Sequence, residues 1–182
     1  DNLCYGTVYG GFNDVGHGGG LFLNQTWGTL DNMDIHHNTA SMNGGGVWSS
    51  EGSAWTMTNS NVSDNIAPYN GGGFGFWNHN GDDLNATLIN VTIENNTAQP
   101  GWFVGHGGGV WANNSNTIFQ DCIIRNNTAG GNGGGINYFE GGWPELYNCV
   151  IDGNNSDDGG GVYVHHDNGS NNNGLTMDRC LV

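Results

Sequence analysis

The chain has 182 residues, including 35 Gly and 30 Asn, with only two Lys or Arg side chains and a formal net charge of −15 at pH 7. This charge argues against nucleic-acid binding, which draws on Lys and Arg to neutralise phosphates, and against anionic membrane surfaces. Aromatic residues make up 11% of the chain, and no apolar run reaches the roughly 18 residues of a membrane-spanning helix. We therefore expect an ordered acidic domain over residues 1–182, without membrane insertion.

A glycine triplet recurs along the chain in steps of 26, 27, 36, 26 and 26 residues. An apolar residue follows each triplet directly. The triplets begin at Gly18, Gly44, Gly71, Gly107, Gly133 and Gly159. Repetition at this period indicates stacked structural units, so residues 18–182 are predicted to form coils that each start at a triplet. Residues 1–17 are interpreted as a partial coil and a loop.

A second motif, apolar-x-x-Asn, lies between successive triplets, as in "IHHNTA" and "IRNNTA". Further apolar positions lie two and five residues before the apolar residue of this motif. Each unit thus offers three short apolar segments, which are too short for ordinary helices and rich in β-branched residues in two of the three. The pattern predicts about six coils of ~26 residues with three short strands each, stacked at the ~4.8 Å spacing of paired strands.

The two motifs resemble the Gly-Gly-Ala-Ile and Phe-x-x-Asn repeats of polymorphic outer-membrane proteins and related right-handed β-helix repeats. Here they read Gly-Gly-Gly-Val/Ile and Ile/Val-x-x-Asn, over residues 18–182. The resemblance implies an all-β fold, the right-handed parallel β-helix (a solenoid). A β-propeller blade needs roughly 40 residues or more, and leucine-rich repeats have a different frame, so both alternatives are weaker.

Stacked coils should place each motif asparagine above the previous one, where the amides can hydrogen-bond along the axis. This predicted structural ladder consists of Asn38, Asn65, Asn96, Asn127 and Asn154. The chain also contains nine N-x-S/T sequences, the acceptors of N-linked glycans. We expect glycosylation at Asn24, Asn61, Asn85, Asn95, Asn113, Asn126 and Asn168. Asn90 and Asn154 are expected to be shielded by their corner and ladder positions.

Strand alternation should point the residue after each inward apolar position outward. Aromatic side chains occupy this position in four of six units, and they predict an exposed contact surface of Phe22, Trp48, Trp111 and Tyr163. Coverage of these side chains by the insertion that carries Trp102 and Phe103 is the alternative.

The cysteines show no C-x-x-C spacing, which argues against a zinc site. Cys122, Cys149 and Cys180 share one apolar slot in consecutive coils, where a ladder of free thiols is favoured over a disulfide. Cys4 lies outside this slot and could pair across a chain end.

No set of residues predicts catalysis. A polysaccharide lyase needs basic residues to bind acidic sugars, and no repeat position collects the two carboxylates of a glycosidase. Acidic turns such as "DNMD", "NGDD" and "NNSDD" could bind Ca²⁺ through oxygen ligands, but we interpret them as solvated and expect no cofactor. The neighbours His36 and His37 should point to opposite faces of a strand, which disfavours a shared metal.

The chain begins and stops within a coil, and its two ends together complete one repeat. An uncapped solenoid exposes unpaired strands, which head-to-tail stacking would cover while propagating a filament. We therefore expect a non-enzymatic extracellular or cell-surface protein, a glycosylated β-helical segment of a fibre or stalk. The alternative is a carbohydrate-binding adhesin or polysaccharide-acting module that uses the outer aromatic residues or the loops.

Overall fold

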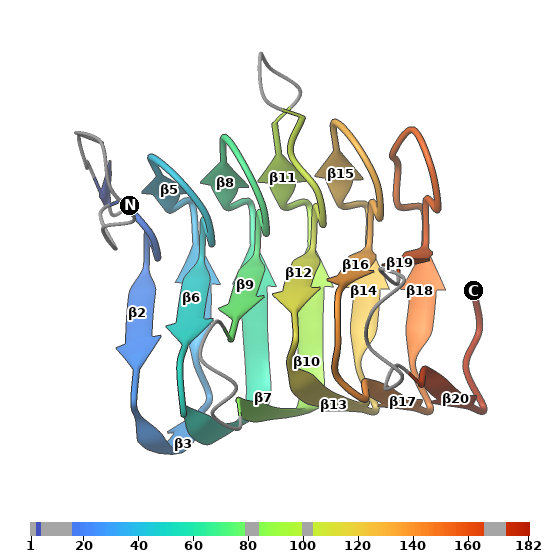
Figure 1. Ribbon diagram of the computed structural model, residues 1–182, viewed down its shortest axis with the longest axis horizontal. Coiled ribbons are helices and arrows are strands. Elements are labelled where there is room, and N and C mark those ends of the chain that lie inside the picture. The colour runs from blue at the N-terminus through green and yellow to red at the C-terminus, as the bar shows by residue number, and fades with distance from the viewer. Residues whose placement is uncertain (1–2, 5–15, 79–83, 100–103, 166–173) are drawn as a thin grey trace.

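The computed structural model describes residues 3–4, 16–78, 84–99, 104–165 and 174–182. These residues form a parallel β-solenoid whose coils stack along the longest axis of the molecule (Figure 1). No helix occurs among them, and strands from successive coils pair in parallel. The predicted all-β parallel β-helix is confirmed.

Six strands follow the glycine triplets and form one sheet, here called the triplet sheet. They are β2 (Leu21–Asn24), β6 (Val47–Ser50), β9 (Phe74–Trp77), β12 (Val110–Asn113), β16 (Ile136–Phe139) and β19 (Val162–His165). The order in space is β19-β16-β12-β9-β6-β2, so sequential coils are also neighbours. Residues at equal distances from each triplet are paired in register.

The second and third predicted segments of each coil share a single nine-stranded sheet, here called the long sheet. Its strands are β3 (Trp27–Asp31), β4 (Asp34–His36), β7 (Ala54–Ser63), β10 (Asn85–Glu94), β13 (Asn116–Gln120), β14 (Ile123–Arg125), β17 (Glu145–Tyr147), β18 (Val150–Asp152) and β20 (Thr176–Asp178). In β7 and β10 the two segments form one continuous strand. Asn59 and Asn90 have left-handed backbones (φ 50° and 54°) at the junction, so one residue bends the strand while the flanking residues stay paired.

The sequence patterns did not predict the third sheet, which consists of two-residue strands. These are β1 (Leu3–Cys4), β5 (Thr39–Ala40), β8 (Ile66–Ala67), β11 (Thr97–Ala98) and β15 (Thr128–Ala129). Four of them directly follow a motif asparagine. Each gains its pairing only from the neighbouring coils, because two residues are too few to show a hydrophobic period.

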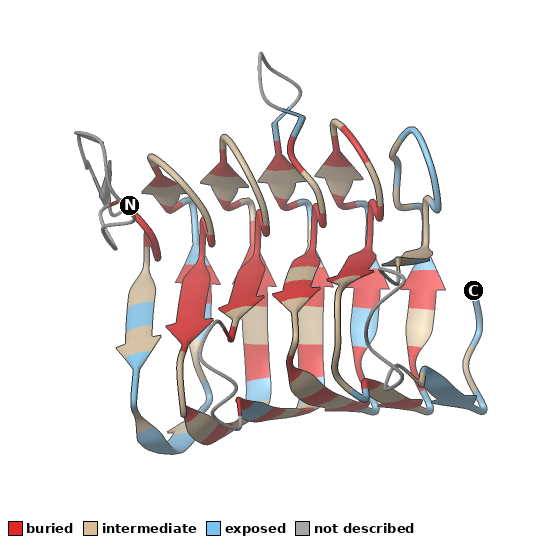
Figure 2. Ribbon diagram, viewed as in Figure 1, coloured by how far each residue is buried: buried red, intermediate tan, exposed pale blue. Residues whose placement is uncertain are grey.

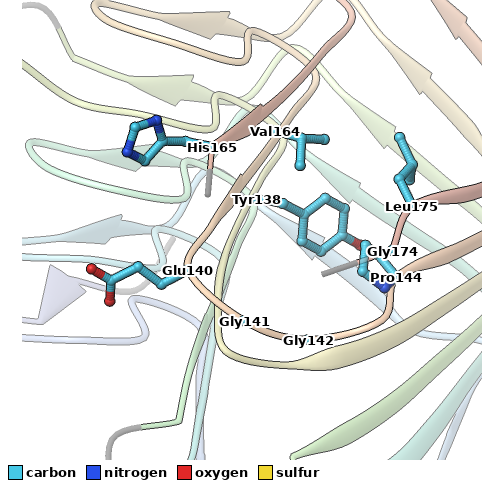
Figure 3. A pocket seen from close by; sticks show the side chains of 9 residues that line it. All are labelled: Tyr138, Glu140, Gly141, Gly142, Pro144, Val164, His165, Gly174 and Leu175. Atoms are coloured by element: carbon cyan, nitrogen blue, oxygen red, sulfur yellow. The ribbon is translucent and has the colours of Figure 1, made fainter. Parts of the chain in front are cut away.

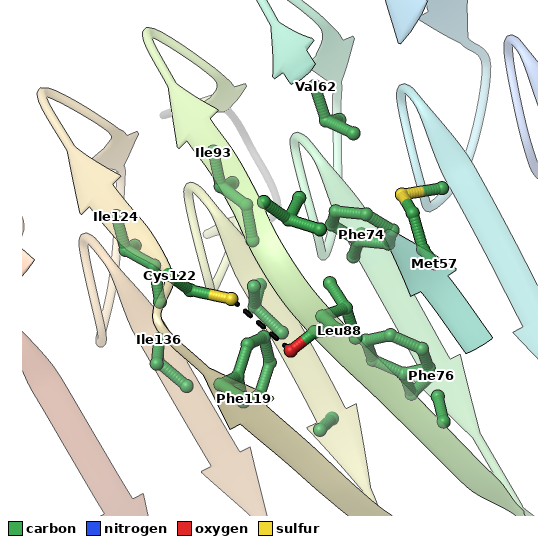
Figure 4. Close-up of a cluster of buried hydrophobic side chains, with 14 of the residues drawn as sticks. Met57, Val62, Phe74, Phe76, Leu88, Ile93, Phe119, Cys122, Ile124 and Ile136 are labelled. Atoms are coloured by element: carbon green, nitrogen blue, oxygen red, sulfur yellow. Dashed lines mark hydrogen bonds between the residues drawn. The ribbon is translucent and has the colours of Figure 1, made fainter. Parts of the chain in front are cut away.

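Inward side chains of the triplet and long sheets form one core that runs along the axis (Figure 4). Leu88 and Phe119 are fully buried on neighbouring strands of the long sheet, and Phe74 and Phe76 stack with ring centroids 5.7 Å apart. Figure 2 shows buried residues concentrated in the central coils and exposed residues in the last one. Burial of each large side chain contributes about 1.5–3 kcal/mol, so the central coils carry most of the hydrophobic stabilisation.

The triplet glycines allow neighbouring coils to touch through their backbones. The first glycine of each triplet has a positive φ, as at Gly107 (67°), which residues with a Cβ rarely adopt. The second lies against the next coil, and a Cβ on Gly108 would come 2.5 Å from the Gly134 carbonyl oxygen. The triplets therefore form a close-packed seam in which a methyl group has no room.

The motif asparagines form a continuous ladder at an inner corner of the coils. Backbone N–H and Nδ2 of Asn96 donate to Oδ1 of Asn127 at 2.9 and 3.0 Å, and Nδ2 also donates to the Val62 carbonyl oxygen at 2.8 Å. Equivalent bonds join Asn38 to Asn65, Asn65 to Asn96 and Asn127 to Asn154. The ladder gives the buried amides hydrogen-bond partners, which buried polar groups require.

Candidate functional site

One residue per coil points outward from the triplet sheet directly after the inward apolar residue, and these six are here called the outer row. The row runs Phe22, Trp48, Gly75, Trp111, Asn137 and Tyr163, each paired in register with the next. Phe22 is exposed, whereas Trp111 and Tyr163 are half-buried. The row therefore has two gaps, at Gly75 and at Asn137, where an aromatic side chain is missing.

Trp48 does not belong to an exposed surface, so this part of the predicted contact surface is wrong. The side chain is only 1% exposed because its indole lies over Gly75, where an added Cβ would meet ring atoms of Trp48. The indole stacks on His17 at 4.4 Å and lies nearly parallel to Trp111 at 6.1 Å, with 10° between their planes. The first gap is thus filled from the preceding coil. Trp102 and Phe103, the predicted cover, lie outside the described residues.

The second gap, at Asn137, remains open as a groove of about 320 Å³ on the outer face of the triplet sheet. Trp111 lies on the coil before Asn137 and Tyr163 on the coil after it. Phe139 and His165 extend the aromatic wall, with stacked rings 5.1 Å apart, and the ring of Tyr163 is parallel to His165 at 6.4 Å. The groove therefore offers flat apolar faces in a size range typical of small-molecule sites.

A second polar ladder borders the groove, formed by residues that directly precede the triplets. Asn70 Oδ1 accepts a hydrogen bond from the His106 N–H at 3.1 Å, and His106 Nδ1 accepts one from the Asn132 N–H at 3.0 Å. Burial lowers the pKa of His106 from its usual value of 6.5. Because Nδ1 is an acceptor, the neutral ring carries its proton on Nε2, which makes this atom a donor.

Asn137 contributes a buried amide to the lining of the groove. Its side chain is 2% exposed, and its Nδ2 donates to the Asn132 carbonyl oxygen at 3.3 Å. Its Oδ1 is buried and has no hydrogen-bond partner among the described residues. An unsatisfied buried acceptor costs about 1–3 kcal/mol, so this oxygen is suited to accept a hydrogen bond from a bound molecule.

A second and much smaller cavity is also lined by residues of β16 and β19 (Figure 3). Its volume is about 10 Å³, and its lining includes Tyr138, Pro144, Gly174 and Leu175. Burial raises the pKa of the Tyr138 hydroxyl well above its usual range. This cavity has room for about one water molecule, so the groove at Asn137 is the better candidate site.

The structure places the predicted glycosylation sites in three kinds of environment. Asn24, Asn85, Asn95 and Asn126 are exposed, Asn61 and Asn113 are half-buried, and Asn168 lies outside the described residues. Asn154 is half-buried within the asparagine ladder, as expected. Asn90 is exposed, so its predicted shielding is wrong: its left-handed backbone lies at an outer corner, and its Nδ2 donates to Asn59 Oδ1 at 2.9 Å.

The three cysteines of the shared slot are free thiols, with Cys122 and Cys149 buried and Cys180 half-buried. The Cys122 thiol donates to the Leu88 carbonyl oxygen at 3.4 Å (Figure 4). Its hydrogen bond with the Cys149 thiol and its burial raise the Cys122 pKa well above the usual range. Cys122 is therefore inert, because the thiolate is the reactive form. The same hydrogen bond lowers the pKa of the Cys149 thiol to about 7. The backbone of Cys4 pairs with Ala40.

His36 and His37 do not point to opposite faces, because His37 has a left-handed backbone (φ 55°) that breaks the strand alternation. Their Nδ1 atoms lie 2.8 Å apart. In the acidic turn that starts at Asp31, hydrogen bonds from Thr58 and Asn59 lower the pKa of the Asp31 carboxyl group. Within the described ranges no group of three His, Cys, Asp or Glu residues could hold a metal ion. Residues 80–83, the "NGDD" turn, lie outside those ranges.

The protein is a stacked parallel β-solenoid with an inner asparagine ladder and a lateral groove on its triplet sheet. A family model described as a right-handed β-helix region matches residues 12–182. The chain belongs to this right-handed β-helix family. This match does not test the more specific resemblance to the repeats of polymorphic outer-membrane proteins, which stays a prediction. No curated protein and no solved structure matches the chain. In the described part of the chain, no helix is long and apolar enough to cross a membrane.

Proposed function

We propose that the protein is a non-enzymatic structural segment of an extracellular fibre or surface stalk, built by end-to-end stacking of β-helices. The observation that carries this proposal is the open face of the last coil. Leu181 and Val182 are 66% and 69% exposed there, and Met177, an inward core position in earlier coils, is also exposed. Apolar side chains beside unpaired strand edges favour pairing with a further coil, whether that coil continues this chain or belongs to a second copy.

The opposite face of the stack supports the same proposal. Trp27 and Phe22, in the first strands of the long and triplet sheets, are exposed. Two such faces on one molecule differ from each other, so their contact is heterologous and propagates rather than closing a dimer. The net charge of −15 opposes the contact, and salt screens that repulsion within about 8 Å at 0.15 M. We therefore expect association to increase with ionic strength.

The decisive experiment compares the wild-type chain with Gly160→Ala and Leu181→Asp by sedimentation velocity and electron microscopy across a salt series. Fibres of the wild type should show an axial repeat of roughly 29 Å, six strand spacings of about 4.8 Å. Among the described residues, a Cβ at Gly160 would lie near the Asn154 carbonyl group alone, 3.0 Å from its oxygen. This variant should therefore fold but resist stacking, because the triplet of a second copy needs that space.

Ile123→Asp is the matched control, since Ile123 is an exposed apolar residue on the side of the long sheet rather than at an end. It should associate like the wild type. Monomers at every protein and salt concentration, or equal loss of association in Ile123→Asp and Leu181→Asp, would contradict end-to-end stacking.

The extracellular assignment and N-linked glycosylation are part of the same proposal, and the exposed side chains of Asn24, Asn85, Asn95 and Asn126 support them. A glycan needs an accessible asparagine on the surface of a secreted protein. Intact mass before and after glycosidase treatment of protein from its native source tests this point. An unmodified mass would contradict it.

A further inference from the structure

The outer row has two gaps, at Gly75 and at Asn137. The Trp48 indole fills the first gap, whereas the second is the open groove. At the first gap, the Trp48 indole lies over Gly75 and is parallel to Trp111 within 10°, at a centroid distance of 6.1 Å. At the second gap, Trp111 and Tyr163 are two strand spacings apart, about 9.6 Å at Cα. Rings stack on aromatic faces at about 4.5–7 Å, so the second gap accepts one flat ring from outside the chain.

The polar groups around this gap are suited to hydroxyl groups. Asn137 Oδ1 is a buried acceptor without a partner among the described residues, and His106 Nε2 is a donor because Nδ1 is already occupied. Asn70 accepts a hydrogen bond through Oδ1, so its Nδ2 is the donor end of the side chain. A ligand with several hydroxyls can satisfy an acceptor and two donors at once.

The absence of charged side chains from the groove lining determines which hydroxyl-rich ligands suit it. The residues that line the groove include no Asp, Glu, Lys or Arg. A carboxylate or sulfate on the ligand would find no cation in the groove, and the net charge of −15 would repel it. The groove therefore favours an uncharged molecule with one apolar ring face and hydroxyls around its edge.

We propose that this groove binds a neutral pyranose residue of an oligosaccharide. The apolar C–H face of the sugar ring stacks on Trp111 or Tyr163, and its hydroxyls hydrogen-bond to Asn137 Oδ1, His106 Nε2 and the Asn70 amide. The site does not depend on end-to-end stacking, because it faces sideways from the triplet sheet. It assigns a binding role to this face without a catalytic step.

The test is isothermal titration calorimetry with cellotetraose, chitotetraose and mannotetraose, and with tetragalacturonate as the charged counterpart. The protein is produced in a host that adds no N-linked glycans. We expect at least one neutral tetrasaccharide to bind, with at least tenfold weaker binding of tetragalacturonate. Trp111→Ala and Asn137→Leu should each weaken the neutral ligand about tenfold, because the first removes a stacking face and the second removes the unpaired acceptor.

Two further variants separate this site from general effects on the fold. Asn137→Tyr introduces the residue found at the same position of the next coil, and it should fill the groove and abolish binding while circular dichroism stays unchanged. Ile123→Ala removes an exposed apolar side chain on the long sheet, outside the groove, and should leave affinity unchanged. Absence of binding by all three neutral tetrasaccharides at 5 mM (about five times a weak Kd of ~1 mM), equal binding of tetragalacturonate, or full binding by Asn137→Tyr would overturn the proposal.

Discussion

The middle of the stack and its last coil use the same sequence positions with different results. Phe119 in β13 is fully buried, whereas Met177, its counterpart in β20, is 36% exposed. Val110 is buried in β12, and its counterpart Val162 in β19 is only half-buried. The difference teaches that a coil does not bury its own side chains. The next coil along the axis covers them, as expected of a solenoid in which repeats contact only their neighbours.

The largest difference should appear when matched core residues of the two regions are truncated. Phe119→Ala should lower the free energy of unfolding by about 4 kcal/mol, because it leaves a cavity between coils. Met177→Ala should cost about 1 kcal/mol, since its side chain is already partly in water. Urea unfolding at a protein concentration where the chain is monomeric measures both. Equal losses would mean that the last coil is buried as well as the middle.

The seam of triplet glycines gives the next largest contrast. Gly108→Ala places a methyl group against the backbone of the next coil and should cost about 3 kcal/mol through overpacking. Gly160→Ala, at the same position of the last triplet, should cost under about 1 kcal/mol, because no described coil lies above it. Thermal unfolding of the two variants checks this, and a large loss in Gly160→Ala alone would contradict the interpretation of the seam.

Substitutions in the asparagine ladder should also cost more stability in the middle of the stack than in the last coil, but the losses should be smaller. Asn96→Ala removes the acceptor for Asn65 and the donor to the Val62 carbonyl, which should cost about 2 kcal/mol as buried groups lose their partners. Asn154→Ala should cost about 1 kcal/mol, because its side chain is half-buried and water can replace part of what is lost. Hydrogen exchange of the Asn65 and Asn127 amides provides a local measurement alongside global unfolding.

The smallest effect concerns the pH dependence contributed by His106. Burial lowers its pKa in the folded protein below 6.5, so the unfolded chain takes up a proton first as the pH falls. The contribution to stability is therefore complete above pH 6.5 and decreases from there down to the folded-state pKa. His106→Asn should flatten this slope while keeping the ladder, because Asn70 already accepts the next N–H at this position. If the free energy of unfolding depended on pH in the same way in the wild type and in His106→Asn, His106 would not be the group responsible.

Much of the fold could be predicted because a solenoid converts sequence period directly into spatial register. Asn96 and Asn127 are 31 residues apart, yet their hydrogen bond follows from aligning two motifs. The two-residue strands such as Thr97–Ala98 were missed because their pairing comes entirely from other coils. The continuous strands β7 and β10 were missed because a left-handed asparagine bends a strand without ending it.

The candidate site was less predictable than the fold. Alternation placed Trp111, Asn137 and Tyr163 in one outward row, and this row proved to border the groove. His106 and Asn70 were not selected as site residues, although their position directly before a triplet repeats in the other coils. That repeated position was the available signal, since equivalent positions stack along the axis.

The sequence by itself determined the period, the inward and outward positions, the glycine corners and the asparagine register, since all of these depend on spacing along one chain. The tertiary structure alone decided which outward side chains remain accessible. Trp48 is buried because a glycine 27 residues later leaves room for its indole, and the groove stays open because Asn137 is too small to fill the same space one gap further on. Such outcomes depend on the sizes of side chains that meet across coils, which no local pattern encodes.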